Sequence, residues 1–288
     1  MGASFPSPPI NHRHMARALA ACFALAGLFI LTDFAVRGQG AQDVREIKLS
    51  VEDPRPVAKA IEMLESRYGW AITYEDPRYA HESEIADVAL KVRRDLDKYK
   101  PGEVPPVLVP KGGALEFTYD VAPDTNLPTD PARVVQRLLD AQTVSGNAGW
   151  FRLETIGRIM HVIPTTIKNS EGRLVPQESV LDTIISLPAE ERTAERKLES
   201  ICLAISRATN IGVVVGAIPT NWFYQHIDQQ GATNQKARDV LANMFETMAE
   251  DSEVNLSWRL FYGPGDKRYV LNVHWVSKRD GKSHPKSH

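Results

Sequence analysis

The chain has 288 residues, with 43% hydrophobic and 24% charged side chains and a formal net charge of −2. These are the proportions of an ordinary globular protein with room for one large domain or two small ones. A charge so close to zero argues against nucleic acid as a partner, because nucleic-acid-binding domains carry a strongly basic surface.

Residues 1–41 have the layout of a secretory signal peptide. Basic residues precede an apolar run over Ala18–Leu31, and small or polar residues follow it. We expect this signal, around residues 15–41, to direct the protein to the periplasm or cell envelope. An uncleaved membrane anchor is the alternative, although Asp33 interrupts the apolar run below the roughly 18–20 residues that a spanning helix needs.

Cysteine usage fits an exported protein held together by its own core. Cys22 lies in the signal segment, so Cys202 is the one cysteine expected in the mature chain and no intramolecular disulfide can form. Cys202 shares an apolar helical face with Leu198 and Ile205. This position favours a buried core thiol over a catalytic nucleophile.

The first half of the chain is predicted to follow the order β-α-β-β-α-β-β. Residues 75–113 form an insertion, in which a helix capped by Ser83 would give way to a proline-rich stretch that excludes a helix interior. The second helix begins at Pro131, with Asp130 as its cap. The expected strands are 47–51, 70–74, 115–119, 150–155 and 158–163, and the expected helices are 57–68 and 131–145.

Residues 165–178 lack periodicity and read as a linker, after which the same order restarts. The run 211–217 is continuously apolar, which predicts a strand buried on both faces. Residues 221–227 are expected to be extended, and the polar, basic tail 278–288 is expected to be disordered. The other expected elements are strands 180–187, 256–262 and 269–276 and helices 198–208 and 237–248.

The two halves also share short sequence signatures at matching places. Ala132-Arg133 and Ala237-Arg238 stand at the start of corresponding helices. An aromatic-Arg-Leu triplet follows on the next strand of each half, at 151–153 and 258–260. Such internal similarity predicts a repeated structural unit. We therefore expect an α+β protein of two tandem domains, 44–164 and 179–277, each with two helices packed on small sheets.

No residue pattern indicates catalysis. The histidines lack the spacing of a zinc site. Acid–base catalysis needs carboxylates that converge from different elements, whereas the acidic pairs here are neighbours in the sequence, such as Glu75-Asp76 and Glu190-Glu191. We expect no enzyme activity, no cofactor and no metal site.

Three consecutive aromatic residues, Trp222, Phe223 and Tyr224, are the candidate partner-binding site. An extended segment would point at least one of them outward, and large aromatic side chains are enriched in protein interfaces. The alternative is that this segment packs between two elements of its own domain.

The order of elements in each half resembles the short N-terminal domain of secretins and TonB-dependent receptors, the STN domain. The segments that carry the resemblance are Ile47–Tyr68, Trp70–Tyr74 and Ala132–Ile163 in the first half and Val180–Thr209, Ile211–Ala217 and Ala237–Val276 in the second. The resemblance implies a periplasmic protein–protein interaction module without catalytic residues. No secretin ring segment or outer-membrane barrel follows in this sequence, so it implies the module rather than the channel or receptor.

The sequence thus predicts a non-enzymatic, exported protein–protein interaction module of the bacterial cell envelope, bound to an envelope protein through a sheet edge or through residues 222–224. One alternative is a hydrolase or carbohydrate-binding protein with a site between the two domains, which would show convergent carboxylates or histidines from both halves. A purely structural role in the envelope is a third hypothesis.

Overall fold

A computed structural model describes residues 45–100, 102–250 and 252–278. The expected signal segment and nearly all of the expected disordered tail lie outside these residues. The described elements all belong to one unit of the chain, and their mixture of helices and strands confirms the predicted α+β class.

The first half contains the predicted elements in the predicted order. Helix α1 begins with Pro56 at its first turn and ends at Gly69, whose φ of 73° lies in the left-handed region that glycine adopts without strain. Asp130 caps α3 by accepting a hydrogen bond from the Arg133 N–H. The elements are β1 (Arg45–Asp53), α1 (Pro56–Tyr68), β2 (Ile72–Glu75), β5 (Gly113–Val121), α3 (Pro131–Ser145), β6 (Trp150–Ile156) and β7 (Ile159–Lys168).

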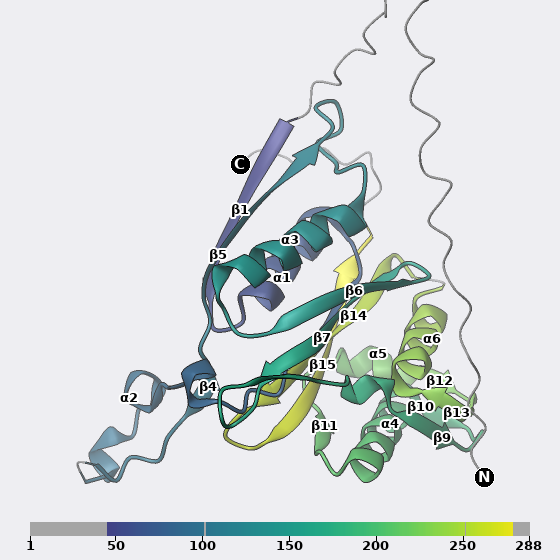
Figure 1. The fold of residues 1–288 in the computed structure, drawn as a ribbon. Coiled ribbons are helices and arrows are strands. Elements are labelled where there is room, and N and C mark those ends of the chain that lie inside the picture. The colour runs from purple at the N-terminus through teal and green to yellow at the C-terminus, as the bar shows by residue number, and fades with distance from the viewer. Residues whose placement is uncertain (1–44, 101, 251, 279–288) are drawn as a thin grey trace, which may run out of the picture. The chain divides into compact units, whose positions relative to one another are not determined.

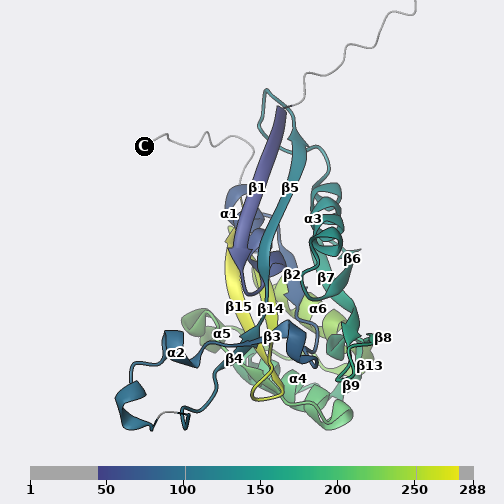
Figure 2. The ribbon, with the colours of Figure 1, turned by 60° about the vertical axis from the view of Figure 1, so that its left-hand side comes forward.

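The insertion differs from the expected long helix. Its pieces are a 3-10 turn (Glu82–Glu84), β3 (Ile85–Asp87), α2 (Ala89–Val92), a second 3-10 turn (Leu96–Lys98) and β4 (Leu108–Pro110), which pairs with β3. The prediction of a helix capped by Ser83 is wrong, because Ile85–Asp87 form β3, which pairs with β4 across the insertion. The α2 region projects from the rest of the fold in both ribbon views (Figures 1 and 2).

The second half repeats the same order with short additions. It consists of a 3-10 turn (Val180–Asp182), β9 (Ile184–Leu187), β10 (Arg192–Thr193), α4 (Ala194–Thr209), β11 (Val213–Val215), α5 (Thr220–Gln225), β12 (Ile227–Asp228), β13 (Ala232–Lys236), α6 (Ala237–Ala249), β14 (Val254–Gly263) and β15 (Arg268–Ser277).

Two expectations for the second half are wrong. Residues 220–225 form the short helix α5 rather than an extended segment, with the His226 N–H bonded to the Trp222 carbonyl. Within 211–217 only Val213 is fully buried and Val214 is 38% exposed. The reason is that β11 lies at the end of its sheet and only one of its faces meets a core.

One seven-stranded sheet joins the two halves, in the order β11-β15-β14-β2-β7-β6 with β8 (Leu174–Pro176) alongside β7 (Figure 1). The junction is the parallel pairing of β14 with β2. Half of the predicted linker 165–178 belongs to β7 and β8. The expected boundaries 44–164 and 179–277 therefore mark two repeats whose strands form one common sheet. They do not mark two domains with separate sheets.

Each half adds a two-stranded sheet, β1 with β5 and β9 with β13, which encloses its helices. The helices α1 and α3 belong to one core and α4 and α6 to another. Along β7, Ile159 packs in the second core and Met160 in the first. Successive strand residues point to opposite faces, so the two pairs of helices cover opposite faces of the shared sheet (Figure 1).

No helix among the described residues combines the length and the apolar character that crossing a membrane would require.

Candidate functional site

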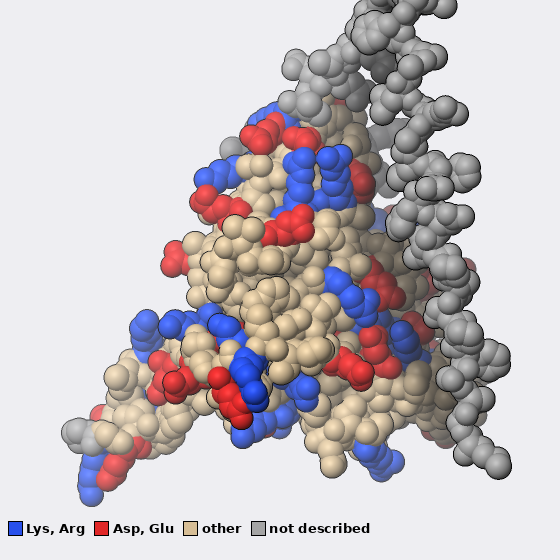
Figure 3. Space-filling view, in the orientation of Figure 1, with Lys and Arg blue, Asp and Glu red and all other residues tan. Residues whose placement is uncertain are grey.

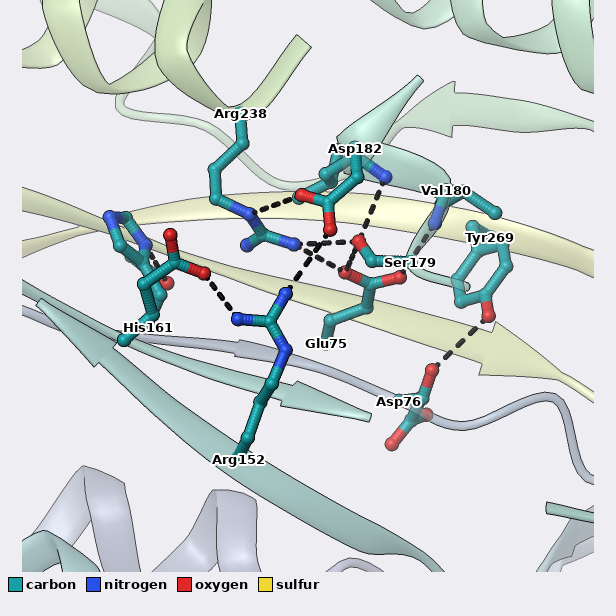
Figure 4. A network of polar contacts seen from close by, with 12 residues as sticks. Glu75, Asp76, Arg152, His161, Ser179, Val180, Asp182, Arg238 and Tyr269 are labelled. Atoms are coloured by element: carbon teal, nitrogen blue, oxygen red, sulfur yellow. Dashed lines mark hydrogen bonds and ion pairs between the residues drawn. The ribbon is translucent and has the colours of Figure 1, made fainter. Parts of the chain in front are cut away.

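Three carboxylates of the first half converge on the second half at the β14–β2 junction. Glu75, at the end of β2, is fully buried. It accepts hydrogen bonds from the Val180 N–H at 3.0 Å, from the Ser179 hydroxyl, and from Nη2 of Arg238 at 3.1 Å (Figure 4). Arg238 also bonds Asp182 through Nε at 3.1 Å. This carboxylate is therefore fully engaged by groups of its own chain.

Asp76 is buried in the same way beside Glu75. Its carboxylate accepts from Nε of Arg55 at 2.6 Å, from the Tyr74 hydroxyl at 2.8 Å and from the Tyr262 N–H at 2.9 Å. Burial raises the pKa of both Glu75 and Asp76, and the adjacent arginines only partly offset it.

Glu65, on the last turn of α1, is the third carboxylate. It bonds Arg259 of β14 and lies 2.9 Å from Nε2 of His274 on β15. Burial acts to raise the pKa of Glu65, but the Arg259 charge and the contact with His274 outweigh it and hold the pKa below its usual value. Arg259 also donates to the Ile72 carbonyl of β2 at 2.6 Å.

These contacts make the junction a structural feature rather than an acid–base site. The buried carboxylates face arginines and backbone N–H groups, and a general acid or base must reach a substrate. His161 is also fully buried, bonded to Thr73 at 2.7 Å, and burial together with Arg238 lowers its pKa to about 3, so it is neutral. The acidic pair Glu75-Asp76, read as unremarkable in the sequence, thus holds the halves together.

Cys202 confirms its predicted place in the core. It is 2% exposed, and burial raises the pKa of its thiol to about 12. A thiol in this state is a poor nucleophile.

The three aromatic residues of α5 point in different directions, because a helix distributes consecutive side chains around its axis. Phe223 is fully buried against Phe245, with ring centroids 6.1 Å apart, and so cannot contact a partner. Tyr224 is 52% exposed, and Trp222 is half-buried.

Trp222 meets Trp275 of β15 at the surface. Their ring centroids lie 6.2 Å apart with the planes inclined at 61°, and Trp275 is 57% exposed. The two rings form part of a pocket of about 390 Å³, which we call the aromatic pocket. Its lining residues are Trp222, His226, Thr247, Met248, Ser252, Val254 and Trp275. A histidine is present, but none of these lining residues carries a carboxylate.

Sequence reasoning missed Trp275. Tyr269, Leu271 and Val273 precede it on the same face of β15 and are all buried, so the alternating pattern assigns Trp275 to the core as well. The available signal was its position, two residues from the end of the strand, where the core no longer covers this face of the sheet.

A larger pocket of about 790 Å³ is lined by residues of both halves, with Gly157, Arg158 and Ile159 on one side and residues of α6 on the other. Its carboxylates, Glu246 on α6 and Glu250 just after the end of α6, come from the same half. It therefore lacks convergent carboxylates or histidines from both halves. Among the described residues, no group of three or more His, Cys, Asp or Glu side chains is placed to hold a metal ion.

Comparisons with family models, with curated proteins and with solved structures found no match to this chain.

Proposed function

We propose that the protein is a non-enzymatic, exported protein–protein interaction module of the cell envelope, and that the aromatic pocket is its partner-binding surface. The observation that carries the proposal is the pair Trp222 and Trp275, which keep large apolar surfaces in contact with solvent on two separate elements. Tryptophan is the residue type most enriched among energetically dominant interface residues.

The chemistry of the pocket suits an apolar side chain of a protein partner. Its volume of about 390 Å³ has room for a large side chain, and Met248 and Val254 add apolar walls. The hydroxyls of Thr247 and Ser252 already donate to carbonyls of their own chain. His226 is thus the polar side chain of the lining that remains to hydrogen-bond a ligand.

Export is supported by the signal-like segment around residues 15–41. On the face shown in Figure 3, positive and negative side chains are interspersed rather than gathered into a basic patch. This distribution supports a protein partner over nucleic acid.

The alternative of carbohydrate binding draws on the same two tryptophans, because indole faces also stack on sugar rings. A hydrolase has less support, since the carboxylates that converge from different elements are buried and engaged by arginines.

The test is quantitative co-purification of partners from an envelope fraction with the tagged protein. Trp222→Ala and Trp275→Ala should each weaken capture more than about tenfold, the loss typical of a central interface tryptophan. Leu90→Ala is the matched control, since Leu90 is 74% exposed on α2, outside the pocket. Unchanged capture by both tryptophan variants contradicts the proposal, and loss of glycan binding alone would favour the carbohydrate alternative.

A further inference from the structure

The sheet ends in two strands that are counterparts of the two strands paired at its centre. Each half contributes three strands in matching order, β2-β7-β6 and β11-β15-β14. At the junction β14, which is third in the sheet order of the second half, lies beside β2, which is first in the sheet order of the first half. The outer edges are formed by β6, the counterpart of β14, and by β11, the counterpart of β2.

The strand directions and helix positions follow one operation. β2 and β14 run parallel, β14 and β15 antiparallel, and β15 and β11 parallel. β11 therefore runs opposite to β2, and the helices of the two halves cover opposite faces. The halves are related by a half-turn about an axis that lies in the plane of the sheet and perpendicular to its strands, combined with a shift of three strands along that axis. Repeating it places the β11 strand of another copy beside β6.

Residue details at the β2 and β11 edges agree with this relation. The Ile72 N–H donates to Glu65, seven residues earlier on α1, at 3.1 Å. The Val213 N–H donates to Ser206, seven residues earlier on α4, at 2.8 Å. Both helices end in a left-handed residue, Gly69 and Asn210.

The other side of the junction also has its counterpart. Arg259 pairs with Tyr74 in the β14–β2 register. The aromatic-Arg-Leu triplet places Arg152 of β6 at the position of Arg259, and the hairpin pairings of the two strands agree. Arg152 is 44% exposed.

Both outer edges offer backbone groups for pairing. β11 bonds β15 through Gly212 and Gly216, so the alternating backbone groups of Val213 and Val215 point away from β15. Ser206 bonds both the N–H and the carbonyl of Val213, and the Ala217 N–H donates to Asn272, so Val215 carries the backbone groups that this edge offers. On β6, Leu153 lies at the position of Leu260, whose carbonyl accepts the Asp76 N–H at the junction. Unpaired strand edges of this kind are templates for strand addition.

We propose that copies of this chain associate head to tail, with β6 of one copy pairing in parallel with β11 of the next. The register is that of the junction, so Arg152 lies opposite Val215 and Leu153 opposite Gly216. The contact joins two different surfaces and is open-ended. It uses neither Trp222 nor Trp275 and does not depend on the proposed function.

The contact between copies is weaker than the junction it repeats. At the junction Arg259 reaches the carboxylate of Glu65, whereas the corresponding helix position next to β11 is Ser206. Arg152 instead forms ion pairs with Glu154 and Asp182 of its own copy. Association is therefore reversible, and Ser206→Glu, which supplies the missing carboxylate, should strengthen it.

Sedimentation velocity over a wide concentration range tests the association. The weight-average mass of the purified protein should rise continuously past that of a dimer. Val215→Pro blocks the β11 edge and Leu153→Pro blocks the β6 edge, so each variant alone should stay monomeric. An equimolar mixture of the two should stop at the dimer, since each retains one open edge. Circular dichroism confirms that the variants are folded.

Cysteine cross-linking tests the register without proline. Arg152→Cys mixed with Val215→Cys should form a disulfide-linked dimer on mild oxidation, whereas Arg152→Cys with Val214→Cys should not, because Val214 points to the other face. Cys202 is buried and does not compete. A protein that stays monomeric at all concentrations, with no register-specific cross-link, overturns the proposal. Growth that neither proline variant affects also overturns it.

Discussion

Buried charged side chains of strands and of helix α6 meet at the β14–β2 junction. Glu75 and Arg238 are fully buried or nearly so, and each has its counterpart charge within hydrogen-bonding distance. A buried ion pair adds little net stability over an apolar pair, but removing one partner leaves an uncompensated charge. The network therefore specifies which strands meet more than it strengthens the fold.

Arg238→Met should destabilise the protein by about 3–5 kcal/mol, because Glu75 would remain buried with its charge unpaired. Arg152→Met is the matched control: Arg152 also bonds Asp182, but at the surface, and the expected cost is below about 1 kcal/mol. Urea unfolding followed by circular dichroism measures both. Equal losses for the two variants would contradict the structural role of the buried arginine.

His161 should make the protein less stable in acid. Burial lowers its folded-state pKa from 6.5 to about 3. Between about pH 6.5 and pH 3 the unfolded state therefore binds a proton at His161 that the folded state does not. Over this range the free energy of unfolding falls by about 1.4 kcal/mol per pH unit as the pH falls, and above about pH 6.5 this loss is absent. Unfolding free energies of His161→Gln and the parent protein, measured from pH 7 to pH 4, should differ in slope by this one proton. Parallel pH profiles would show that His161 does not carry the effect.

At the scale of elements, periodicity identified the helices α3 and α6 and both hairpins, because their apolar faces meet a core along most of their length. It failed at α5, where three adjacent aromatic residues suggested a strand while Phe223 alone enters the core. It also failed at β11, since an apolar run does not reveal whether a strand is central or at an edge. The aromatic pocket was half predicted, through Trp222 but not Trp275.

The ends of α1 and α4 offer a matched pair for testing local backbone conformation. Gly69 and Asn210 both have a φ in the left-handed region, 73° and 59°. Gly69→Ala and Asn210→Ala should each cost about 1 kcal/mol, because a Cβ disfavours this conformation at Gly69 and alanine adopts it less readily than asparagine at Asn210. Thermal unfolding measures the cost. A neutral Gly69→Ala would show that the helix end can shift.

At the scale of the whole molecule, the sequence indicated the repeat but not the shared sheet. Local periodicity defines each strand's inward face, whereas β2 and β14 are brought together from opposite ends of the chain. The information lay in the polar residues: Glu65 and Glu75 interrupt apolar runs of the first half, and their partners Arg259 and Arg238 interrupt those of the second.

The shared sheet predicts that the two halves unfold together. Separating them would expose the paired edges of β2 and β14 and strip Glu65 and Glu75 of their arginines. Calorimetry should therefore give one transition whose measured enthalpy equals the van't Hoff enthalpy. Residues 42–178 and 179–278 expressed apart should each lack cooperative unfolding, because each fragment leaves its charges without partners. Two resolved transitions, or one fragment that melts cooperatively alone, would show that the repeats are independent domains and that the junction is only a contact between them.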